Sequence, residues 1–314
     1  MTGPANLRRK WQELSSACLN PPTATHLLTL ELIDDKPERR RTVRYRGADG
    51  RRVIGKLLAD PQRARRLYAN HLHMWQAGLG VPQPIELAMS EHLVLYLEAP
   101  GTPLDELFST AFVGTLASDA GRWLAALQSS AIALDRTFDL ANETSNLVSW
   151  GHVVDDRVPS GHGRATRLAE HLGNAAALLD MGVGTPIHKD FHAGHILVDG
   201  GRFTVIDLDE MRFGDAAFDI GHFLAYLRLA AWRAEERAFD VAGLEQRFID
   251  GYRIAGGKAA MRHVWWAQAY AFLKIGRQLV LGEGAPPRPM GEAMHRQLDL
   301  AIEAGEMCVG HASV

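Results

Sequence analysis

The sequence predicts an α+β protein with two lobes, a small antiparallel β lobe followed by a larger, mainly helical lobe. Before residue 98 the chain contains β-branched and alternating runs with one helical run. After residue 104 most runs carry apolar residues three and four positions apart, which is typical of helices. A length of 314 residues also fits about two domains. We therefore expect residues 1–97 to form the first lobe and residues 98–314 the second.

The first lobe is predicted to begin with an antiparallel meander. Its strands are expected at residues 25–33, 42–46 and 52–59, separated by the polar turns DDKPERR and GADG. A helix should follow and end near Gly78 and Gly80. A further strand pair is expected at 84–88 and 92–97, before a hinge with the sequence EAPGTP.

The second lobe is predicted to be helical apart from one hairpin. The hairpin lies in HILVDGGRFTVIDLD, where Asp199, Gly200 and Gly201 have the residue types of a tight turn. The stretch APPRP should form a loop before a final helix. The other helices are expected at residues 121–129, 164–179, 216–229, 236–255 and 261–281.

Composition argues against several partners. There are 34 basic and 37 acidic residues, so the formal charge of -3 provides no global field to attract nucleic acid or an anionic membrane. The apolar stretch at 264–273 is about half as long as a bilayer span requires. Cys18 and Cys308 form no disulfide framework, and no secretory signal is visible. We expect a cytoplasmic protein without a membrane or nucleic-acid partner; its oligomeric state is left open.

The densest group of polar side chains lies between residues 186 and 219. Because the predicted hairpin reverses the chain, the loop before it and the segment after it should meet at one end. Asp190, His195 and Asp207 are then expected to lie close together. Two carboxylates and an imidazole suit either a divalent cation or acid–base chemistry. The same segment also contains His188, His192 and Asp209.

This segment resembles the catalytic core of the aminoglycoside phosphotransferase and choline kinase group, relatives of the protein kinases. The kinase catalytic loop reads H-R-D, four residues and Asn, with a metal-binding Asp further on. HKDFHAGH places Asp190 at the position of the base and His195 at that of the Asn, and VIDLD places Asp207 at the metal position. The resemblance implies a protein-kinase-like fold and transfer of the γ-phosphoryl group of ATP or GTP to a hydroxyl of a small metabolite or aminoglycoside-like compound.

By this resemblance, Asp190 orients and deprotonates the substrate hydroxyl, and Asp207 holds Mg²⁺. His195 departs from the family pattern, because an imidazole nitrogen suits Mn²⁺ better than Mg²⁺. Two roles stay open for it: it ligates the metal through nitrogen, or it hydrogen-bonds Asp190 while water completes the coordination.

The nucleotide site implied by the resemblance lies in the first lobe. Lys56, in a predicted strand, matches the lysine that pairs with phosphates. The following helix has Ala69 where a partner Glu is expected and carries no acidic residue in RRLYANHLHMW. We expect Glu86 or Asp207 to orient Lys56, or else a weaker role for this lysine.

Two further parts of the first lobe are expected to meet the nucleotide. Arg39 and Arg40 stand where a glycine-rich loop is usual, and either face phosphate or lie on the surface. Backbone groups from Tyr96 to Glu98 should meet adenine, with the side chains of little importance.

Other polar residues of the segment have structural interpretations. His188 is expected to pack in the core. Asp215 is a candidate helix N-cap, and Asp219 could bind backbone N–H groups of the catalytic loop. Asp209 and Glu210 are either surface charges or face the substrate.

Two functions compete with the kinase hypothesis. The missing helix Glu and His195 at the Asn position are compatible with a nucleotide-binding pseudokinase or regulator. His188, His192 and His195, with Asp190 and Asp207, could instead form the site of a metal-dependent hydrolase.

Overall fold

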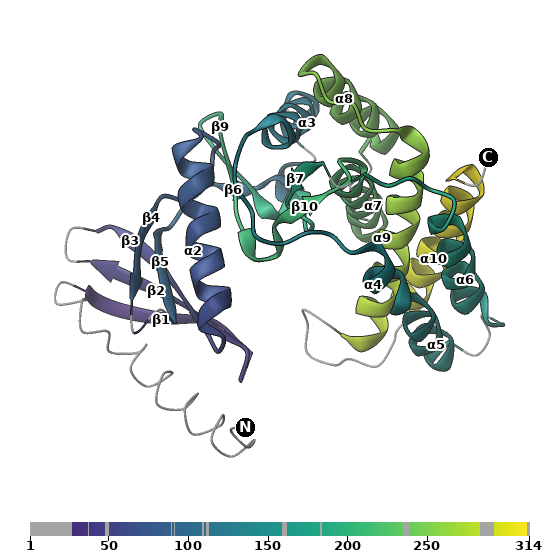
Figure 1. Cartoon of the computed structure of the whole chain (residues 1–314), viewed down its shortest axis with the longest axis horizontal. Coiled ribbons are helices and arrows are strands. Elements are labelled where there is room, and N and C mark those ends of the chain that lie inside the picture. Colours follow the sequence, from purple (N-terminus) through teal and green to yellow (C-terminus); the bar gives the residue numbers. More distant parts are fainter. Residues whose placement is uncertain are drawn as a thin grey trace. The chain divides into compact units, whose positions relative to one another are not determined.

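The computed structural model of the chain describes residues 27–312 apart from 37, 48–49, 89, 91, 109, 111–112, 159–161, 183, 235–238 and 283–291. Cys18, the expected APPRP loop and the first residues of the helix expected from 236 lie outside the described residues. The chain divides into two compact units (Figure 1). The first holds residues 1–102 and 197–209, and the second holds residues 103–196 and 210–314.

The first unit is built on a five-stranded antiparallel sheet. The strands are β1 (Leu27–Lys36), β2 (Arg40–Gly47), β3 (Arg52–Leu58), β4 (Pro84–Ala88) and β5 (Leu93–Leu97). Their order is β1-β2-β3-β5-β4, so the predicted meander of the first three strands is confirmed. Lys56 lies on the central strand β3 and is buried.

The turn between β1 and β2 is shorter than predicted. Asp34 and Asp35, expected in the turn, continue β1 instead, and Asp35 lies opposite Arg41 in the ladder. Opposite charges at neighbouring positions of two strands stabilise their pairing. Arg41 accordingly donates to Asp35 at 2.6 Å.

Helix α2 (Pro61–Gln76) covers the sheet, beside which it lies in Figure 1. It begins where Asp60 accepts a hydrogen bond from the Gln62 amide and Pro61 occupies the first turn. Its buried face is unusual because it includes Asn70 and His71 among apolar residues.

The predicted hairpin is confirmed as β8 (Ile196–Asp199) and β9 (Arg202–Val205), joined with β6 (Thr102–Pro103) in a three-stranded sheet. Gly200 and Gly201 in its turn have φ angles of 52° and 83°, which residues without a Cβ adopt at no cost. The hairpin follows directly on the short 3₁₀ helix η3 (Ala193–His195) and leads to η4 (Leu208–Glu210). Residues 197–209 group with the first unit, although we expected the whole hairpin in the second lobe.

The second unit is mainly helical, as predicted. Helix α9 (Met261–Leu281) matches its predicted bounds. Helices α6 (Arg164–Ala176), α7 (Ala217–Ala234) and α8 (Val241–Ile254) differ from their predicted bounds by a few residues, and α3 (Val113–Ser129) begins earlier than predicted. Helices α4 (Leu140–Ser145) and α5 (Leu147–Arg157) were not predicted, because both are short and have weakly periodic apolar residues. The helices are η1 (Leu104–Leu107), α3 (Val113–Ser129), α4 (Leu140–Ser145), α5 (Leu147–Arg157), α6 (Arg164–Ala176), α7 (Ala217–Ala234), α8 (Val241–Ile254), α9 (Met261–Leu281) and α10 (Glu292–Ala312), with strands β7 (Thr185–Ile187) and β10 (Arg212–Gly214).

Helix α9 is the central element of this unit. It is buried along most of its length and packs against α7, α10 and α5. Trp266, Phe272 and Ile275 are fully buried on it. A polar residue on such a helix is held inside the unit rather than at its surface, which matters for Lys274.

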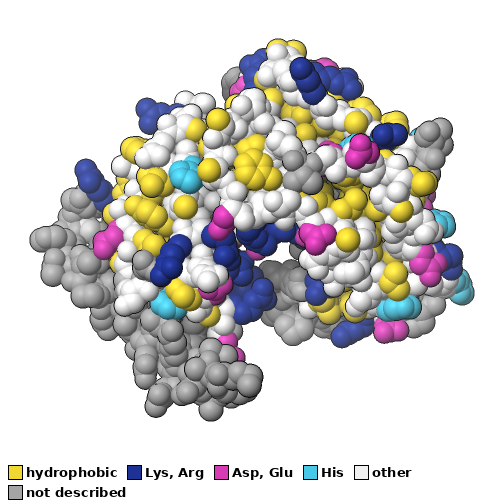
Figure 2. All heavy atoms as spheres, viewed as in Figure 1, with side chains coloured by type: hydrophobic (Ala, Val, Ile, Leu, Met, Phe, Trp, Pro, Cys, Tyr) yellow, Lys and Arg dark blue, Asp and Glu magenta, His cyan; other side chains and the backbone are white. Residues whose placement is uncertain are grey.

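On the face shown in Figure 2, basic, acidic and hydrophobic side chains all lie at the surface, and several basic ones gather near its centre. Among the described residues, no helix is both long enough and apolar enough to cross a bilayer.

Buried His71 makes stability depend on pH. Its ring stacks on Tyr96 with centroids 4.5 Å apart and Nδ1 lies 3.3 Å from the Pro82 carbonyl oxygen. Burial lowers the pKa of His71 to about 4. The unfolded chain binds a proton near pH 6.5 and the folded chain does not, so stability falls as the pH drops from about 6.5 towards 4.

We predict that His71→Phe flattens this decline. Between pH 7 and pH 4, His71 lowers the free energy of unfolding by about 3 kcal/mol, because each unit of pKa difference is worth about 1.4 kcal/mol. Urea unfolding at pH 7, 5.5 and 4 measures it. His73→Phe on the same helix is the matched control for replacing a histidine by phenylalanine. If the free energy of unfolding of His71→Phe falls with pH as steeply as that of the unchanged protein, His71 is not the cause of the decline.

Candidate active site

In the first unit, Lys56 is held by two carboxylates. Its Nζ lies 2.5 Å from Asp209 Oδ1 and 2.7 Å from Asp207 Oδ1. Burial alone would lower the pKa of Lys56, but the carboxylates of Asp209 and then Asp207 raise it above its ordinary value. The lysine is therefore charged at neutral pH. Of our two expected partners, Asp207 bonds Lys56, and Asp209 adds a partner that we did not expect.

Asp209 is not a surface charge, which corrects one of our two interpretations of it. Its side chain is 4% exposed and is paired with Lys56 and, at 3.5 Å, with Arg40. A buried carboxylate requires such partners, because an uncompensated charge in the interior is very costly. Asp209 thus supplies the acidic partner that helix α2 lacks. The helix contributes an amide instead, since Asn70 donates to the Leu208 carbonyl oxygen at 3.1 Å.

The chain bends sharply at Asp207, immediately after the hairpin. Its φ angle of 63° is uncommon for a residue with a Cβ and is retained where the surroundings enforce it. Asp207 and Asp209 are two residues apart, and both carboxylates contact Lys56 Nζ. The Asp207 side chain is 28% exposed, whereas Asp209 is enclosed.

The other expected nucleotide residues lie on the same sheet. Arg40 pairs with Asp34 at 3.0 Å in addition to Asp209. The Glu98 side chain pairs with Arg44 at 2.7 Å. The ring of Tyr96 stacks on His71. The amides of Leu97 and Glu98 donate within the unit to the Gln83 and Arg52 carbonyl oxygens.

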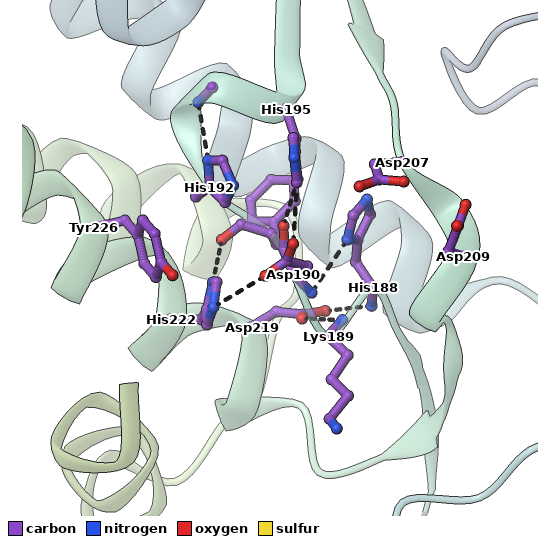
Figure 3. Close-up of polar contacts among 12 residues, drawn as sticks. His188, Lys189, Asp190, His192, His195, Asp207, Asp209, Asp219, His222 and Tyr226 are labelled. Atoms are coloured by element: carbon purple, nitrogen blue, oxygen red, sulfur yellow. Dashed lines mark hydrogen bonds and ion pairs between the residues drawn. The ribbon is translucent and has the colours of Figure 1, made fainter. Parts of the chain in front are cut away.

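In the second unit, Asp190 is carried on a loop that a buried carboxylate holds (Figure 3). Asp219, on the first turn of α7, accepts hydrogen bonds of 2.7 Å from the backbone amides of both His188 and Lys189. This confirms the predicted role of Asp219. Burial raises the pKa of Asp219 to about 7, against the lowering effect of these two amides. Lys189 has a φ angle of 68°, so the loop is held in a strained turn just before Asp190.

His188 and Asp215 also have the predicted structural roles. His188 is fully buried, and its Nδ1 accepts from the Asp190 amide at 3.3 Å. Asp215 accepts from the Ala217 amide at the start of α7 at 2.8 Å and contacts His263 Nδ1 at 2.9 Å. Both residues fix the loop and helix on either side of Asp190.

The Lys274 ammonium lies beside the Asp190 carboxylate. Lys274 Nζ lies 2.9 Å from Oδ1, and His222 Nε2 lies 3.4 Å from the same oxygen. Burial alone would raise the pKa of Asp190, but the Lys274 ammonium holds it far below its ordinary value. Sequence reasoning missed both Lys274 and His222. The only available signal was a lysine inside an otherwise apolar helical run.

His192 and His195 lie beside this carboxylate. His195 Nδ1 lies 2.9 Å from the Asp190 carbonyl oxygen and 3.8 Å from Oδ2, and its ring centroid is 3.8 Å from that of His192. His192 Nδ1 accepts from the Gly194 amide at 3.1 Å, and its ring stacks on Tyr226. Asp190, His192 and His195 each offer a ligand atom within 4.8 Å of the others. The carboxylate and two imidazoles form a donor set that suits a transition metal better than Mg²⁺.

A pocket of about 440 Å³ opens next to this loop within the second unit. Its volume is in the range of small-molecule sites. His192 and Gly194 line one side, and Asp105 and Arg233 add charges of both signs. Aromatic rings of Phe108, Tyr226 and Phe239 complete the lining.

The family of the chain follows from comparison with known proteins. Residues 37–262 match the model of the phosphotransferase enzyme family, and the chain belongs to this family. No protein in the curated set matches the sequence.

Solved structures show that the fold is kinase-like. A choline/ethanolamine kinase family protein from Mesorhizobium loti is 17% identical, with a TM-score of 0.65 over 96% of this chain and 98% of that one. Amicoumacin kinase, bound to AMP-PNP and Ca²⁺, is 14% identical, with a TM-score of 0.68 over 98% and 96% of the two chains. Choline kinase from Streptococcus pneumoniae is also 14% identical, with a TM-score of 0.64 over 94% and 99%. The predicted protein-kinase-like fold is confirmed.

The buried Lys56–Asp209 pair can be tested by stability alone. We predict that Lys56→Met and Asp209→Leu each lower the free energy of unfolding by about 3 kcal/mol, because each leaves a buried charge without its main partner. The double variant Lys56→Met/Asp209→Leu should recover most of this loss. Urea unfolding of the four proteins measures the coupling. Additive losses in the double variant would show that the pair is not coupled.

Proposed function

We propose that the protein is a small-molecule kinase that transfers the γ-phosphoryl group of ATP or GTP to a hydroxyl of a small metabolite or aminoglycoside-like compound. The observation that carries this proposal is Asp190, a charged carboxylate on a loop fixed by Asp219, in a chain of the phosphotransferase enzyme family. The structural neighbours include a spectinomycin phosphotransferase bound to ADP and spectinomycin, whose acceptor is a small molecule.

Asp190 is the proposed catalytic base. The acceptor hydroxyl gives its proton to the carboxylate while its oxygen forms the new bond to phosphorus, and the nucleoside diphosphate leaves with the electrons of the broken P–O bond. The depressed pKa keeps Asp190 ionised and ready to accept a hydrogen bond from the hydroxyl. It also makes the carboxylate a weak base, so its main contribution is orientation of the nucleophile before a late proton transfer.

Lys56 and Arg40 are the proposed cations for the nucleotide phosphates. Both now pair with carboxylates, and a triphosphate would compete for them. Because the amides of Leu97 and Glu98 are engaged, we propose that the segment from Tyr96 to Glu98 meets adenine through its carbonyl oxygens.

Asp207 and His195 are the proposed residues for Mg²⁺, with Mn²⁺ as an alternative. The partly exposed Asp207 carboxylate fits a hard cation. His195 directs Nδ1 towards the Asp190 carbonyl oxygen, so a metal would have to bind at Nε2. A cation held by Asp207 and His195 would supply positive charge to offset the charge that develops on the phosphates.

One rival function loses an argument, and the other has one observation in its favour. A nucleotide-binding regulator was suggested by the missing helix Glu, but Asp209 pairs with Lys56 in its place, so this argument is weaker. The group Asp190, His192 and His195 favours the metal-dependent hydrolase. That hydrolase would be purified with zinc or manganese and would be indifferent to ATP, and elemental analysis distinguishes it.

The proposal predicts that Asp190→Asn abolishes phosphotransfer while the protein still binds nucleotide. A positioned base contributes about 10²- to 10⁴-fold, so kcat should fall by at least about 10²-fold. ADP and GDP release is measured with ATP or GTP, Mg²⁺ or Mn²⁺, and a panel of amino alcohols, sugars and aminoglycosides. Calorimetry measures nucleotide binding separately.

The matched control is Asp199→Asn, at an exposed carboxylate at the turn of the hairpin. It should leave kcat unchanged. Full activity of Asp190→Asn would refute the catalytic role. Nucleotide binding without turnover of any acceptor would favour the regulator.

A further inference from the structure

Lys274 is a half-buried cation that the proposed function does not yet use. Its Nζ lies 2.9 Å from Asp190 Oδ1 and 3.2 Å from His222 Nε2. The lysine lies on α9, far in sequence from the catalytic loop and outside the residues that match the family model. Its position therefore does not follow from the motif that identifies Asp190.

The spacing of two helices explains how Lys274 reaches the loop. His222 and Tyr226 are four residues apart on α7, and Lys274 and Gln278 are four residues apart on α9. Residues at this spacing share one helix face, so two polar pairs form between the packed helices. His222 pairs with Lys274, and the Tyr226 hydroxyl donates to Gln278 Oε1 at 2.7 Å.

The hydrogen bonds also determine the tautomer of His222. Nδ1 lies 3.1 Å from the Phe191 carbonyl oxygen, which only an N–H group can bond. Nε2 then carries a lone pair and accepts from the Lys274 ammonium. Burial lowers the pKa of His222 to about 3, so the ring is neutral. The ammonium is thus directed by two acceptors, a neutral imidazole and Asp190 Oδ1.

An ion pair in this position is poorly explained by stability. Burying an ion pair costs desolvation, and an apolar side chain of similar volume often serves as well. Lys274 projects from a helix whose neighbouring residues Leu273 and Ile275 are buried in the core. What the lysine does provide is a fixed orientation of the carboxylate: with Oδ1 held by the ammonium, rotation of the Asp190 side chain is restricted.

We propose that Lys274 is a positioning residue for phosphotransfer, which holds Oδ1 of Asp190 so that Oδ2 is presented to the acceptor hydroxyl. This inference rests on the proposed kinase function. It assigns His222 a supporting role, since the imidazole directs the ammonium that holds the base.

The test compares Lys274→Met with a charge-matched control, Arg277→Met, one turn along α9. Arg277 lies 5.7 Å from the centroid of the Trp150 ring and is not part of the proposed site. We expect Lys274→Met to lower kcat about 10²-fold, the lower limit for a positioned base, with KM for the nucleotide within about twofold. Arg277→Met should keep kcat. Melting temperature and nucleotide binding by calorimetry confirm that each variant is folded.

Chemical rescue separates positioning from a structural role. In Lys274→Ala, added ethylammonium chloride should restore kcat at least about tenfold, because a small ammonium ion can occupy the vacated space and donate to Asp190. Tetramethylammonium chloride at the same ionic strength has no N–H group and should not. If Lys274→Met does not fold, Lys274→Arg and this rescue decide the question. Arginine keeps the charge but not the geometry, so kcat should fall at least about fivefold.

The possible results separate failure of the inference on Lys274 from failure of the proposed kinase function. If the unchanged protein transfers phosphate to no acceptor, the proposed function fails and the role of Lys274 fails with it. If the unchanged protein is active and Lys274→Met or Lys274→Arg retains its kcat, only the inference on Lys274 is overturned. A lowered kcat with no rescue of Lys274→Ala by ethylammonium also overturns it.

Discussion

A charge inside a protein requires a partner of opposite sign, and this constraint applies to the candidate functional residues of each unit. In the first unit one ammonium, Lys56, compensates the carboxylates of Asp207 and Asp209. In the second, Lys274 compensates Asp190. Since an unpaired buried charge costs far more than a pair, each cation and its carboxylates are fixed relative to one another. The pairs therefore hold the chemical groups in place before any ligand arrives.

The local features of the fold could be predicted from sequence because they depend on neighbouring residues. The hairpin was predicted because Gly200 and Gly201 supply the positive φ angles that its turn requires. Helix α9 was predicted at its observed bounds because its apolar residues recur at helical spacing over many turns. Asp219 was predicted to bind the loop, since a carboxylate on the first helical turn can accept from nearby amides.

The partners of the charged residues could not be predicted in the same way, because they come from distant parts of the chain. Asp209 is 153 residues from Lys56, and Lys274 is 84 residues from Asp190. Only the packing of helices and strands brings such residues together. Motif analysis singled out Asp190 and Asp207 as candidates, since these carboxylates lie near a hairpin in one short segment. It did not find the lysine that holds Asp190, because nothing local to α9 marks Lys274 as more than an isolated charge.

We propose that Asp190 orients a carbon-bound hydroxyl, rather than water, to accept the phosphoryl group. The most direct measurement is ³¹P NMR of the products from ATP or GTP, a divalent cation and an acceptor that accelerates nucleotide consumption. We expect a phosphomonoester signal coupled to carbon-bound protons, formed in equal amount with the nucleoside diphosphate. Inorganic phosphate as the sole phosphorus product besides the diphosphate would contradict it.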